Sequence, residues 1–395
     1  MVFERDCGNF PFGGEYYDYS CHSLQCSETF EERKRLRFPT GCIGHFSVKS
    51  SCNGVLCLLR SHDYVASCYS YAIILWNPSI NKFKILPKPH GQFQSSSDVD
   101  LSLGIGFVPQ TNDYKVVSLS MTRNSDVFYR PQIEMYSLNT DSWTTWTGTY
   151  DVQWMLHGET TDAPVSVNGA VHWTARKTNT HDDDLQLLIV SFHLADEVLR
   201  EICPPEYHRA YFNGRNDGFT SVIHEKLAFT SDHGVPGLYG QEVWEIWLLE
   251  DYDNDESWTK FRTITWVPTC RYMVPLLFLD NGEFVVLDSW KNRLVVFDPK
   301  TRQIVGKVMH GTGFEVVTYT QSLVLLNEGI DASSAEMSSF AKELKEFENE
   351  KREEEKRERV EKRRKEEEEK ELVHIARRVI KGVMEFFKKR RDSYI

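Results

Sequence analysis

The sequence predicts an all-β protein in which similar sheets repeat around a ring. Between about residues 43 and 326, apolar runs of roughly four to eight residues alternate with turn pairs such as Asn-Gly, Asn-Pro and Asp-Pro. No stretch of this region keeps the 3.6-residue period of an amphipathic helix. The strands recur in units of roughly 50 residues, a length typical of four-stranded propeller blades. We therefore expect a β-propeller of about five to six blades.

Aligned aromatic residues mark the repeat. In each unit an apolar strand reaches an aromatic residue, turns through a polar segment and returns to an apolar position. The aligned residues are Trp76, Tyr136, Phe192, Trp247 and Phe297, at intervals of 60, 56, 55 and 50 residues. This spacing is kelch-like, and a sheet of this kind buries its faces only against neighbouring sheets. We interpret these aromatics, with Trp143, Trp173 and Trp258, as core between blades rather than as a ligand site.

Closure of the ring requires one more sheet. Residues 313–326 have strand character, and we expect them to pair with strands from the N-terminal region, because closure protects sheet edges. The pairs Asn53-Gly54, Asn168-Gly169 and Asn281-Gly282 are interpreted as ordinary hairpin turns that need positive φ.

Composition limits the class of protein. Of the 395 residues, 41% are hydrophobic and 13% aromatic, which suffices for a large core. The nine cysteines lack the spacing of a disulfide framework, so we interpret them as reduced thiols of an intracellular protein. The N-terminus has no basic start followed by an apolar run, and we expect a cytoplasmic or nuclear protein.

Charge divides the chain into two parts. Residues 341–395 contain 19 Lys and Arg against 16 Asp and Glu, which leaves 27 against 42 in residues 1–340, a net charge of -15. An acidic body repels phosphate backbones, so the propeller is not expected to bind nucleic acid. The predicted organisation is an N-terminal segment, a propeller, a linker, a charged helix and a basic amphipathic helix, at 1–42, 43–328, 329–340, 341–370 and 371–391.

The last predicted helix needs an apolar cover. Its apolar side could pack on the propeller or on another copy, lie in a partner's groove, or contact an anionic membrane, and membrane contact is the least favoured. The basic runs 362–365 and 388–391 match nuclear localisation signals, but a solvated face accounts for them better.

Motifs for catalysis or metal binding are incomplete. Asp251, Asp253 and Asp255 match the first ligands of an EF-hand, but Glu256 replaces the required glycine and Arg262 replaces the final carboxylate. We interpret this segment as an acidic hairpin loop. His224-Glu225 begins a zinc-protease motif in which Ala228 replaces the second histidine, and Cys21, His22 and Cys26 have no second ligand pair.

Gly104 and Gly106 are followed by Phe-Val-Pro instead of a helix, so no phosphate cradle is predicted, and no nucleophile elbow occurs. We expect no catalytic residue, cofactor or metal. The recognition residues stay unknown, although five segments have the character of variable insertions: 91–100, 121–131, 176–184, 205–217 and 231–241.

Ten ordered motifs give the chain a specific resemblance. Residues 15–326 resemble the F-box-associated (F-box/kelch-repeat) propeller domain of plants. The motifs include SCNGVLCL (51–58), IILWNPSINKFKILPKP (73–89), LGIGFVPQTNDYKVVSL (103–119), VNGAVHW (167–173), EVWEIWLLED (242–251) and LVVFDPKT (294–301).

The resemblance implies a subunit that selects target proteins for an SCF-type E3 ubiquitin ligase. In that family an F-box binds the Skp adaptor, and through it the cullin, while the propeller captures the target and has no catalytic residues. Residues 1–40 resemble the segment that follows the F-box, and the F-box itself is not visible. Three alternatives stay open: a binding module uncoupled from the ligase, a scaffold that acts through residues 341–395, and, least favoured, a propeller enzyme.

Overall fold

The computed structural model describes eighteen stretches of the chain: 2–7, 20–25, 32–36, 45–61, 71–90, 99–122, 131–148, 154–156, 163–178, 185–205, 218–232, 243–265, 273–279, 281–310, 314, 316–324, 326 and 330–331. Every regular element in these stretches is a β-strand, as the fold class predicted. The helices predicted at 341–370 and 371–391 lie outside the described residues. Within the described part, no helix is long and apolar enough to cross a membrane.

The strands form six antiparallel sheets, numbered here along the chain and ordered from the innermost strand outward. Sheet 1 contains β4 (His45–Cys52), β5 (Val55–Ser61), β6 (Tyr71–Asn77), β7 (Lys82–Ile85) and β26 (Ile330–Asp331). Sheet 2 contains β8 (Val99–Val108), β9 (Asp113–Thr122), β10 (Gln132–Ser137) and β11 (Ser142–Thr145). Sheet 3 contains β12 (Trp154–Leu156) and β13 (Val165–Val167), both beside β14 (Ala170–Thr178), then β15 (Leu185–His193) and β16 (Val198–Ile202).

The remaining three sheets complete the set. Sheet 4 contains β17 (Gly218–Ile223), β18 (Lys226–Asp232), β19 (Val243–Leu249) and β20 (Trp258–Thr265). Sheet 5 contains β21 (Met273–Phe278), β22 (Phe284–Asp288), β23 (Arg293–Asp298) and β24 (Gln303–His310). Sheet 6 contains β25 (Val316–Thr318), β1 (Val2–Cys7), β2 (Ser20–Gln25) and β3 (Glu32–Leu36).

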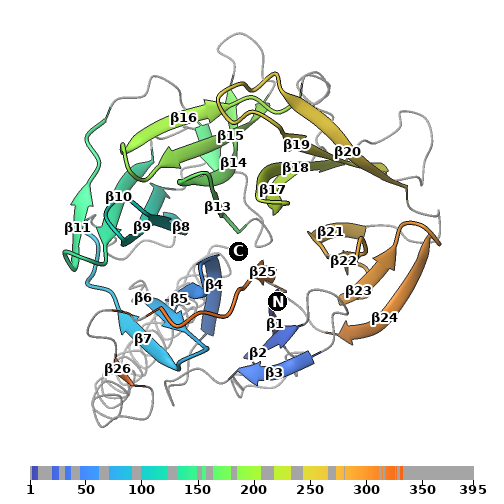
Figure 1. The fold of residues 1–395 in the computed structure, drawn as a ribbon, viewed down its shortest axis with the longest axis horizontal. Helices are drawn as coiled ribbons and strands as arrows, with labels where there is room; N and C mark the ends of the chain where they lie inside the picture. Colours follow the sequence, from blue (N-terminus) through green and yellow to red (C-terminus); the bar gives the residue numbers. More distant parts are fainter. Residues whose placement is uncertain are drawn as a thin grey trace, which may run out of the picture. The chain divides into compact units, whose positions relative to one another are not determined.

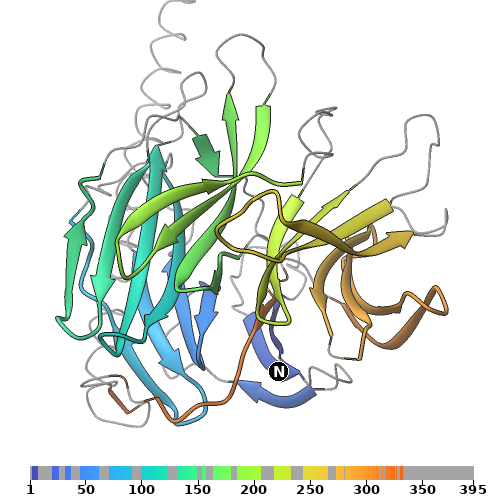
Figure 2. The ribbon, with the colours of Figure 1, turned by 45° about the horizontal axis from the view of Figure 1, so that its top comes forward.

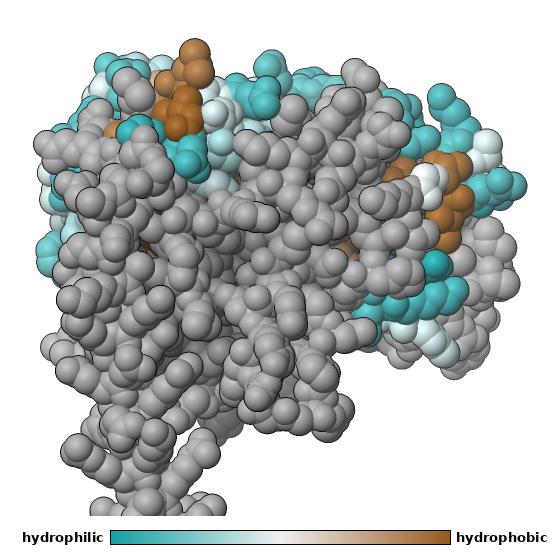
Figure 3. Space-filling model, turned by 90° about the horizontal axis from the view of Figure 1, so that it is seen from below, coloured by the Kyte–Doolittle hydropathy of each residue, from teal (hydrophilic) through white to brown (hydrophobic). Residues whose placement is uncertain are grey.

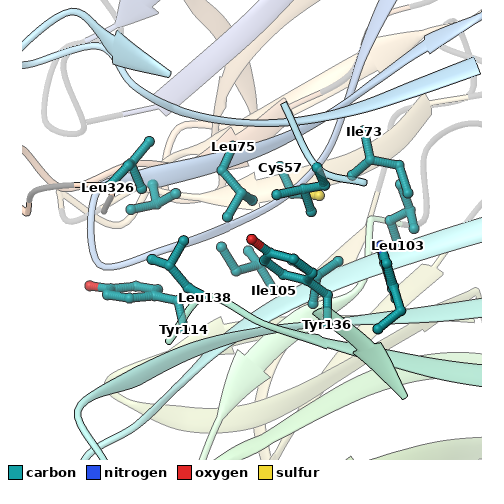
Figure 4. Packing of buried hydrophobic residues seen from close by; sticks show 13 residues of the cluster. Cys57, Ile73, Leu75, Leu103, Ile105, Tyr114, Tyr136, Leu138 and Leu326 are labelled. Carbon is teal, nitrogen blue, oxygen red and sulfur yellow. The ribbon is translucent and has the colours of Figure 1, made fainter. Parts of the chain in front are cut away.

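The six sheets are arranged around a centre, toward which the strands β4, β8, β13, β17, β21 and β25 face (Figure 1). Six apolar clusters fill the spaces between successive sheets, one cluster for each neighbouring pair. The cluster between sheets 1 and 2, for example, joins Leu75 and Cys57 to Ile105 and Tyr136 (Figure 4). Because each sheet lies between two neighbours, both of its faces are covered by apolar side chains.

The periodic aromatics occupy equivalent positions on the third strand of five sheets, which confirms the repeat. Trp76, Tyr136, Phe192 and Phe297 are at most 4% exposed, whereas Trp247 is only partly buried. Two further tryptophans join neighbouring sheets by hydrogen bonds. Trp143 Nε1 donates to Pro87 O over 2.6 Å, and Trp258 Nε1 donates to Cys203 O over 2.8 Å. Packing between sheets therefore explains the tryptophans of the repeat.

The ring closes between the two ends of the described chain. β25 pairs with β1, with Val2 opposite Thr318 and Glu4 opposite Val316. The predicted pairing of segment 313–326 with the N-terminal region is thereby confirmed. The segment before residue 43 supplies three of the four strands of sheet 6.

After β25, residues 319–324 and Leu326 lie across the turns of sheet 1, and we call them the strap. Asn77, which is completely buried, donates from Nδ2 to Ser322 O over 3.1 Å and to Val324 O over 3.0 Å. The strap ends in the cluster between sheets 1 and 2, where Leu326 is buried (Figure 4). A Cβ added to Gly54 would lie 2.5 Å from Thr320 O, so the strap needs glycine in this turn. Sheet 1 therefore holds the segment that closes the ring.

We predict that Asn77→Leu destabilises the propeller by about 2 to 4 kcal/mol, because two partly buried carbonyls of the strap lose the donor that the buried Asn77 supplies. Thermal unfolding of the full-length chain measures the change. Asn139→Ala is the matched control, since the side chain of the exposed Asn139 donates a bond of 3.1 Å to Thr111 O, and its backbone bond to Asp113 is kept in the variant. Equal unfolding temperatures for the two variants would contradict this role of the strap.

Candidate functional site

The two ends of the strands differ in their connections. In an antiparallel sheet, the turn between the first and second strands and the turn between the third and fourth lie at the same end. We call this the short-turn end; it holds the connections β4–β5, β6–β7, β8–β9, β10–β11, β13–β14, β15–β16, β17–β18, β19–β20, β21–β22 and β23–β24. We call the opposite end the long-loop end; it holds the connections β5–β6, β7–β8, β9–β10, β14–β15, β16–β17, β18–β19, β20–β21 and β22–β23.

Contacts between neighbouring sheets place their short-turn ends on one side of the ring. Lys115 Nζ at the start of β9 donates to Leu194 O in the β15–β16 turn over 2.9 Å. The His224 ring in the β17–β18 turn lies 6.5 Å from the Phe278 ring at the end of β21. The ring therefore has two faces of different construction.

Tight turns build the short-turn end (Figure 2). Five four-residue connections end in a residue with positive φ, between 49° and 57°, namely Asn81, Asn112, Asp141, Glu197 and Arg302. This left-handed residue is typical of short hairpin connections. The sequence motif His224-Glu225 is one of the two-residue turns, with φ values of 50° and 62°. The predicted Asn53-Gly54 and Asn168-Gly169 turns also have positive φ at both residues.

Acidic side chains of the short-turn end are bonded within the propeller. Asp141 lies 3.2 Å from Lys84 Nζ, and Glu197 lies 3.3 Å from Lys115 Nζ. Glu250 accepts a hydrogen bond from Lys226, which lowers the pKa of the Glu250 carboxyl below its usual value. These carboxylates therefore already have cationic partners.

The acidic run that partly matches an EF-hand is the β19–β20 connection, a hairpin loop as predicted. Asp251 Oδ1 accepts from Asp253 N over 3.2 Å, which is a local turn bond. Asp255 Oδ2 accepts from Cys203 N over 3.2 Å, and Asp253 Oδ1 lies 3.3 Å from Arg200 Nη1. The loop thus binds the outer strand of sheet 3. Among the described residues, no group of three or more His, Cys, Asp or Glu could hold a metal.

Tyr252 of this loop reaches into sheet 3. Its hydroxyl lies 2.7 Å from Nε2 of His172, whose Nδ1 lies 3.2 Å from Val165 O. His172 is fully buried, and burial lowers its pKa to about 4. A neutral imidazole has one donor and one acceptor nitrogen, which these two partners satisfy. The pair joins sheets 3 and 4.

Buried carboxylates in the described part lie away from the innermost strands. They are Asp113, Glu134, Glu245 and Asp288, on β9, β10, β19 and β22. Glu245 lies 2.5 Å from Lys260 Nζ, and Asp288 lies 2.8 Å from Arg293 Nε. These four carboxylates lie on sheets 2, 4 and 5, and none of them is on an innermost strand.

The five segments that the sequence suggested as variable insertions connect strands at the long-loop end. They lie mainly outside the described residues, but the strand ends that they join are described. The β16–β17 connection, residues 203–217, contrasts with two-residue turns such as Asn168-Gly169 at the other end. Loops carried by a packed scaffold are common places for binding residues, so this end is the candidate site.

Trp290 is a residue of the long-loop end that the sequence interpretation did not single out. It lies in the β22–β23 turn and is 69% exposed. The sequence interpretation did not separate it from the other nine tryptophans. It is exposed because it lies in a four-residue turn, residues 289–292, between two strands. Of the motif Cys21, His22 and Cys26, the first two residues belong to β2. Cys26 lies outside the described residues.

The glycine pair that suggested a phosphate loop lies within β8. A Cβ added to Gly104 would lie 3.0 Å from Cζ2 of Trp173 in sheet 3. Close packing between sheets 2 and 3 therefore explains this glycine.

Comparison with known proteins gives one family. The model of the F-box associated beta propeller domain matches residues 20–326. F-box protein At3g07870 of Arabidopsis thaliana is 26% identical over 351 residues, covering 78% of both chains. F-box protein CPR1 of the same organism is 24% identical over 312 residues, covering 73% of this chain and 68% of its own length.

Among solved structures, a putative 6-phosphogluconolactonase from Bacteroides fragilis matches 80% of this chain and 97% of its own, with 11% identity and a TM-score of 0.34. An apocarotenoid oxygenase from Synechocystis matches 77% of this chain and 70% of its own, with 9% identity and a TM-score of 0.36.

We predict that the propeller loses stability on acidification because of His172. Its pKa is about 4 when folded and 6.5 as an ordinary imidazole, so the unfolded chain binds the proton first as the pH falls. The stabilisation is complete above about pH 6.5 and is lost toward pH 4, by up to about 3 kcal/mol.

Urea unfolding between pH 7 and pH 4.5 measures this dependence. The His172→Gln variant should show a smaller decrease in unfolding free energy than the wild type, and His224→Asn, at an exposed turn histidine, serves as the control. An unchanged pH dependence in His172→Gln would contradict the assignment.

Proposed function

Because the chain belongs to the F-box associated β-propeller family, we propose that it recognises target proteins for an SCF-type E3 ubiquitin ligase. The proposed partners are a target protein, bound by the propeller, and the Skp adaptor with its cullin. Ubiquitin transfer belongs to the other subunits in this proposal, and the chain itself catalyses no reaction. Such a ligase would act in the cytoplasm or the nucleus.

The observation that carries this proposal is the unequal construction of the two faces. At the short-turn end, charged side chains are bonded to one another and the turns are tight. At the long-loop end, a rigid set of strand ends holds the longer connections. Variable connections on a rigid scaffold are the usual basis of protein recognition. We therefore assign target binding to the long-loop end.

The first and last described strand residues both lie at the short-turn end. Val2 pairs with Thr318, and Asp331 pairs with Lys82, so both lie at the short-turn ends of their sheets.

A second function, target binding uncoupled from the ligase, is favoured by one observation. Residues 2–7, 20–25 and 32–36 form strands of sheet 6. Segments engaged in a sheet do not form the helices of an F-box. The described residues before 43 therefore support ring closure, and adaptor binding would need another part of the protein.

Affinity capture from plant lysate distinguishes the two functions. Full-length tagged protein is compared with a variant truncated after Met337, the end of the larger compact unit. We expect specific proteins in both samples, identified by mass spectrometry, with the Skp adaptor and cullin detected by blotting if the chain joins a ligase.

Specific proteins without adaptor and cullin would support the uncoupled function. Loss of all specific proteins on truncation would assign binding to residues 338–395 and contradict recognition by the propeller. Absence of specific proteins from both samples would contradict target recognition altogether.

A further inference from the structure

Cationic side chains occupy an equivalent position on the fourth strand of three sheets. Lys84 on β7, Arg200 on β16 and Arg262 on β20 each lie opposite the residue that directly precedes the aligned aromatic of their sheet. Directly opposite residues of an antiparallel pair share one face of the sheet. Leu75 and Ile246, which lie opposite Lys84 and Arg262, pack against the next sheet of the ring, so these cations face that sheet as well.

Two of the three cations are paired with a carboxylate of the next sheet. Lys84 Nζ lies 3.2 Å from Asp141, in the β10–β11 turn of sheet 2. Arg200 Nη1 lies 3.3 Å from Asp253, in the β19–β20 loop of sheet 4. In both junctions the carboxylate comes from the connection between the third and fourth strands. The repeat therefore builds a place for a carboxylate at the short-turn end, beside the cation of the preceding sheet.

The junction between sheets 4 and 5 lacks this carboxylate. The corresponding turn of sheet 5, residues 299–302, has the sequence Pro-Lys-Thr-Arg, and Arg302 holds the positive-φ position that Asp141 holds in sheet 2. Asp298, directly before this turn, accepts two bonds of 2.8 Å from groups of the turn itself. Within the described residues, Arg262 forms no ion pair, and its contacts are of other kinds.

These other contacts hold the Arg262 guanidinium in place. Its Nη1 donates to Gly282 O over 3.3 Å, and its central carbon lies 5.5 Å from the ring centres of both Phe261 and Phe278. Attraction between a cation and aromatic rings at this distance favours one position of the side chain. Gly282 uses one of the five N–H donors of a guanidinium, so donors are left for a bidentate carboxylate.

The immediate surroundings of Arg262 are aromatic rather than acidic. The ring of His224, exposed in the β17–β18 turn, lies edge-on to Phe261 with 5.6 Å between the ring centres. Figure 3 shows that brown occupies only small separate areas among the coloured residues on the face in view. Apolar area does not mark a docking surface among those residues. The cation that lacks the carboxylate of its equivalents is the feature that points to a ligand.

We propose that the junction between sheets 4 and 5 binds an Asp or Glu side chain of a partner protein, with Arg262 as the cation that receives it. The partner's carboxylate takes the place that Asp141 and Asp253 fill in the equivalent junctions. A single guanidinium matches the single charge of a carboxylate better than the double charge of a phosphate. This site at the short-turn end goes beyond the proposed function, which places the target at the long-loop end.

Fluorescence anisotropy with the full-length chain tests the proposal. The probe is a short labelled peptide in which Glu alternates with Leu, and its counterpart has Gln in place of Glu. We expect the Glu peptide to bind, with affinity that falls as salt rises, and the Gln peptide to bind about tenfold more weakly or worse. Arg262→Gln, which keeps an amide donor for Gly282 O, should weaken binding of the Glu peptide by about tenfold.

Arg200→Gln is the matched control. It removes one positive charge from the equivalent position of sheet 3, where the carboxylate of Asp253 is already present. This variant should bind the Glu peptide with the affinity of the wild type. Thermal unfolding checks that both glutamine variants are folded.

A second pair of variants restores the missing acid. Arg302→Asp places a carboxylate at the position of Asp141, and its φ of 56° is one that Asp and Asn tolerate. The new carboxylate should pair with Arg262 and weaken binding of the Glu peptide by about tenfold. Arg302→Asn removes the same cation without adding an acid, so it should bind as the wild type does and unfold at a lower temperature than Arg302→Asp.

Three results would overturn the proposal. Equal affinity of Arg262→Gln and wild type for the Glu peptide would place binding elsewhere, for example on the basic residues of 341–395. Equal losses in Arg262→Gln and Arg200→Gln would show a general effect of charge. Tighter binding of a phosphoserine counterpart than of the Glu peptide would contradict the choice of a carboxylate.

Discussion

Pairing between β25 and β1 is the contact on which the rest of the propeller depends. It joins residues 316–318 to residues 2–4, so it turns a row of sheets into a ring. In an open row, the first and last sheets would each expose an apolar face and unpaired backbone. The strap bound by Asn77 adds polar bonds directly after this strand. Five of the clusters between sheets join segments that follow one another in the chain. The cluster between sheets 6 and 1 joins residues 48–83 to Val317 and Tyr319.

The order of the strands within the sheets explains why the two faces differ. In sheets 1 to 5 the chain enters at the innermost strand and leaves at the outermost strand, so the connections between these sheets share one end with the second-to-third strand connections. Most described connections at the other end are short hairpin turns with positive-φ residues such as Asn81 and Glu197. Ion pairs such as Lys84 with Asp141 further fix that end. The longer connections are therefore concentrated on one face, outside the packed sheets.

Local sequence patterns predicted much of this fold. The spacing of Trp76, Tyr136 and Phe192 predicted the blades because burial on a third strand repeats once in each sheet. Asn-Gly pairs predicted turns because their backbone needs positive φ. Contacts between distant residues were not predictable in this way: Asn77 meets Ser322 across 245 residues, and Tyr252 meets His172 across 80. Trp290 was missed for the same reason, since only the strand order places its turn at the long-loop end.

Hydrogen–deuterium exchange of the full-length chain, alone and bound to a captured protein, tests the central claim most directly. The account predicts slower exchange on binding in peptides that cover residues 203–217 and 289–292, because a partner at the long-loop end excludes water there. Peptides that cover turns 138–141 and 194–197 should exchange at the same rate in both states. Protection confined to those short turns, with no change at the long-loop end, would contradict the account.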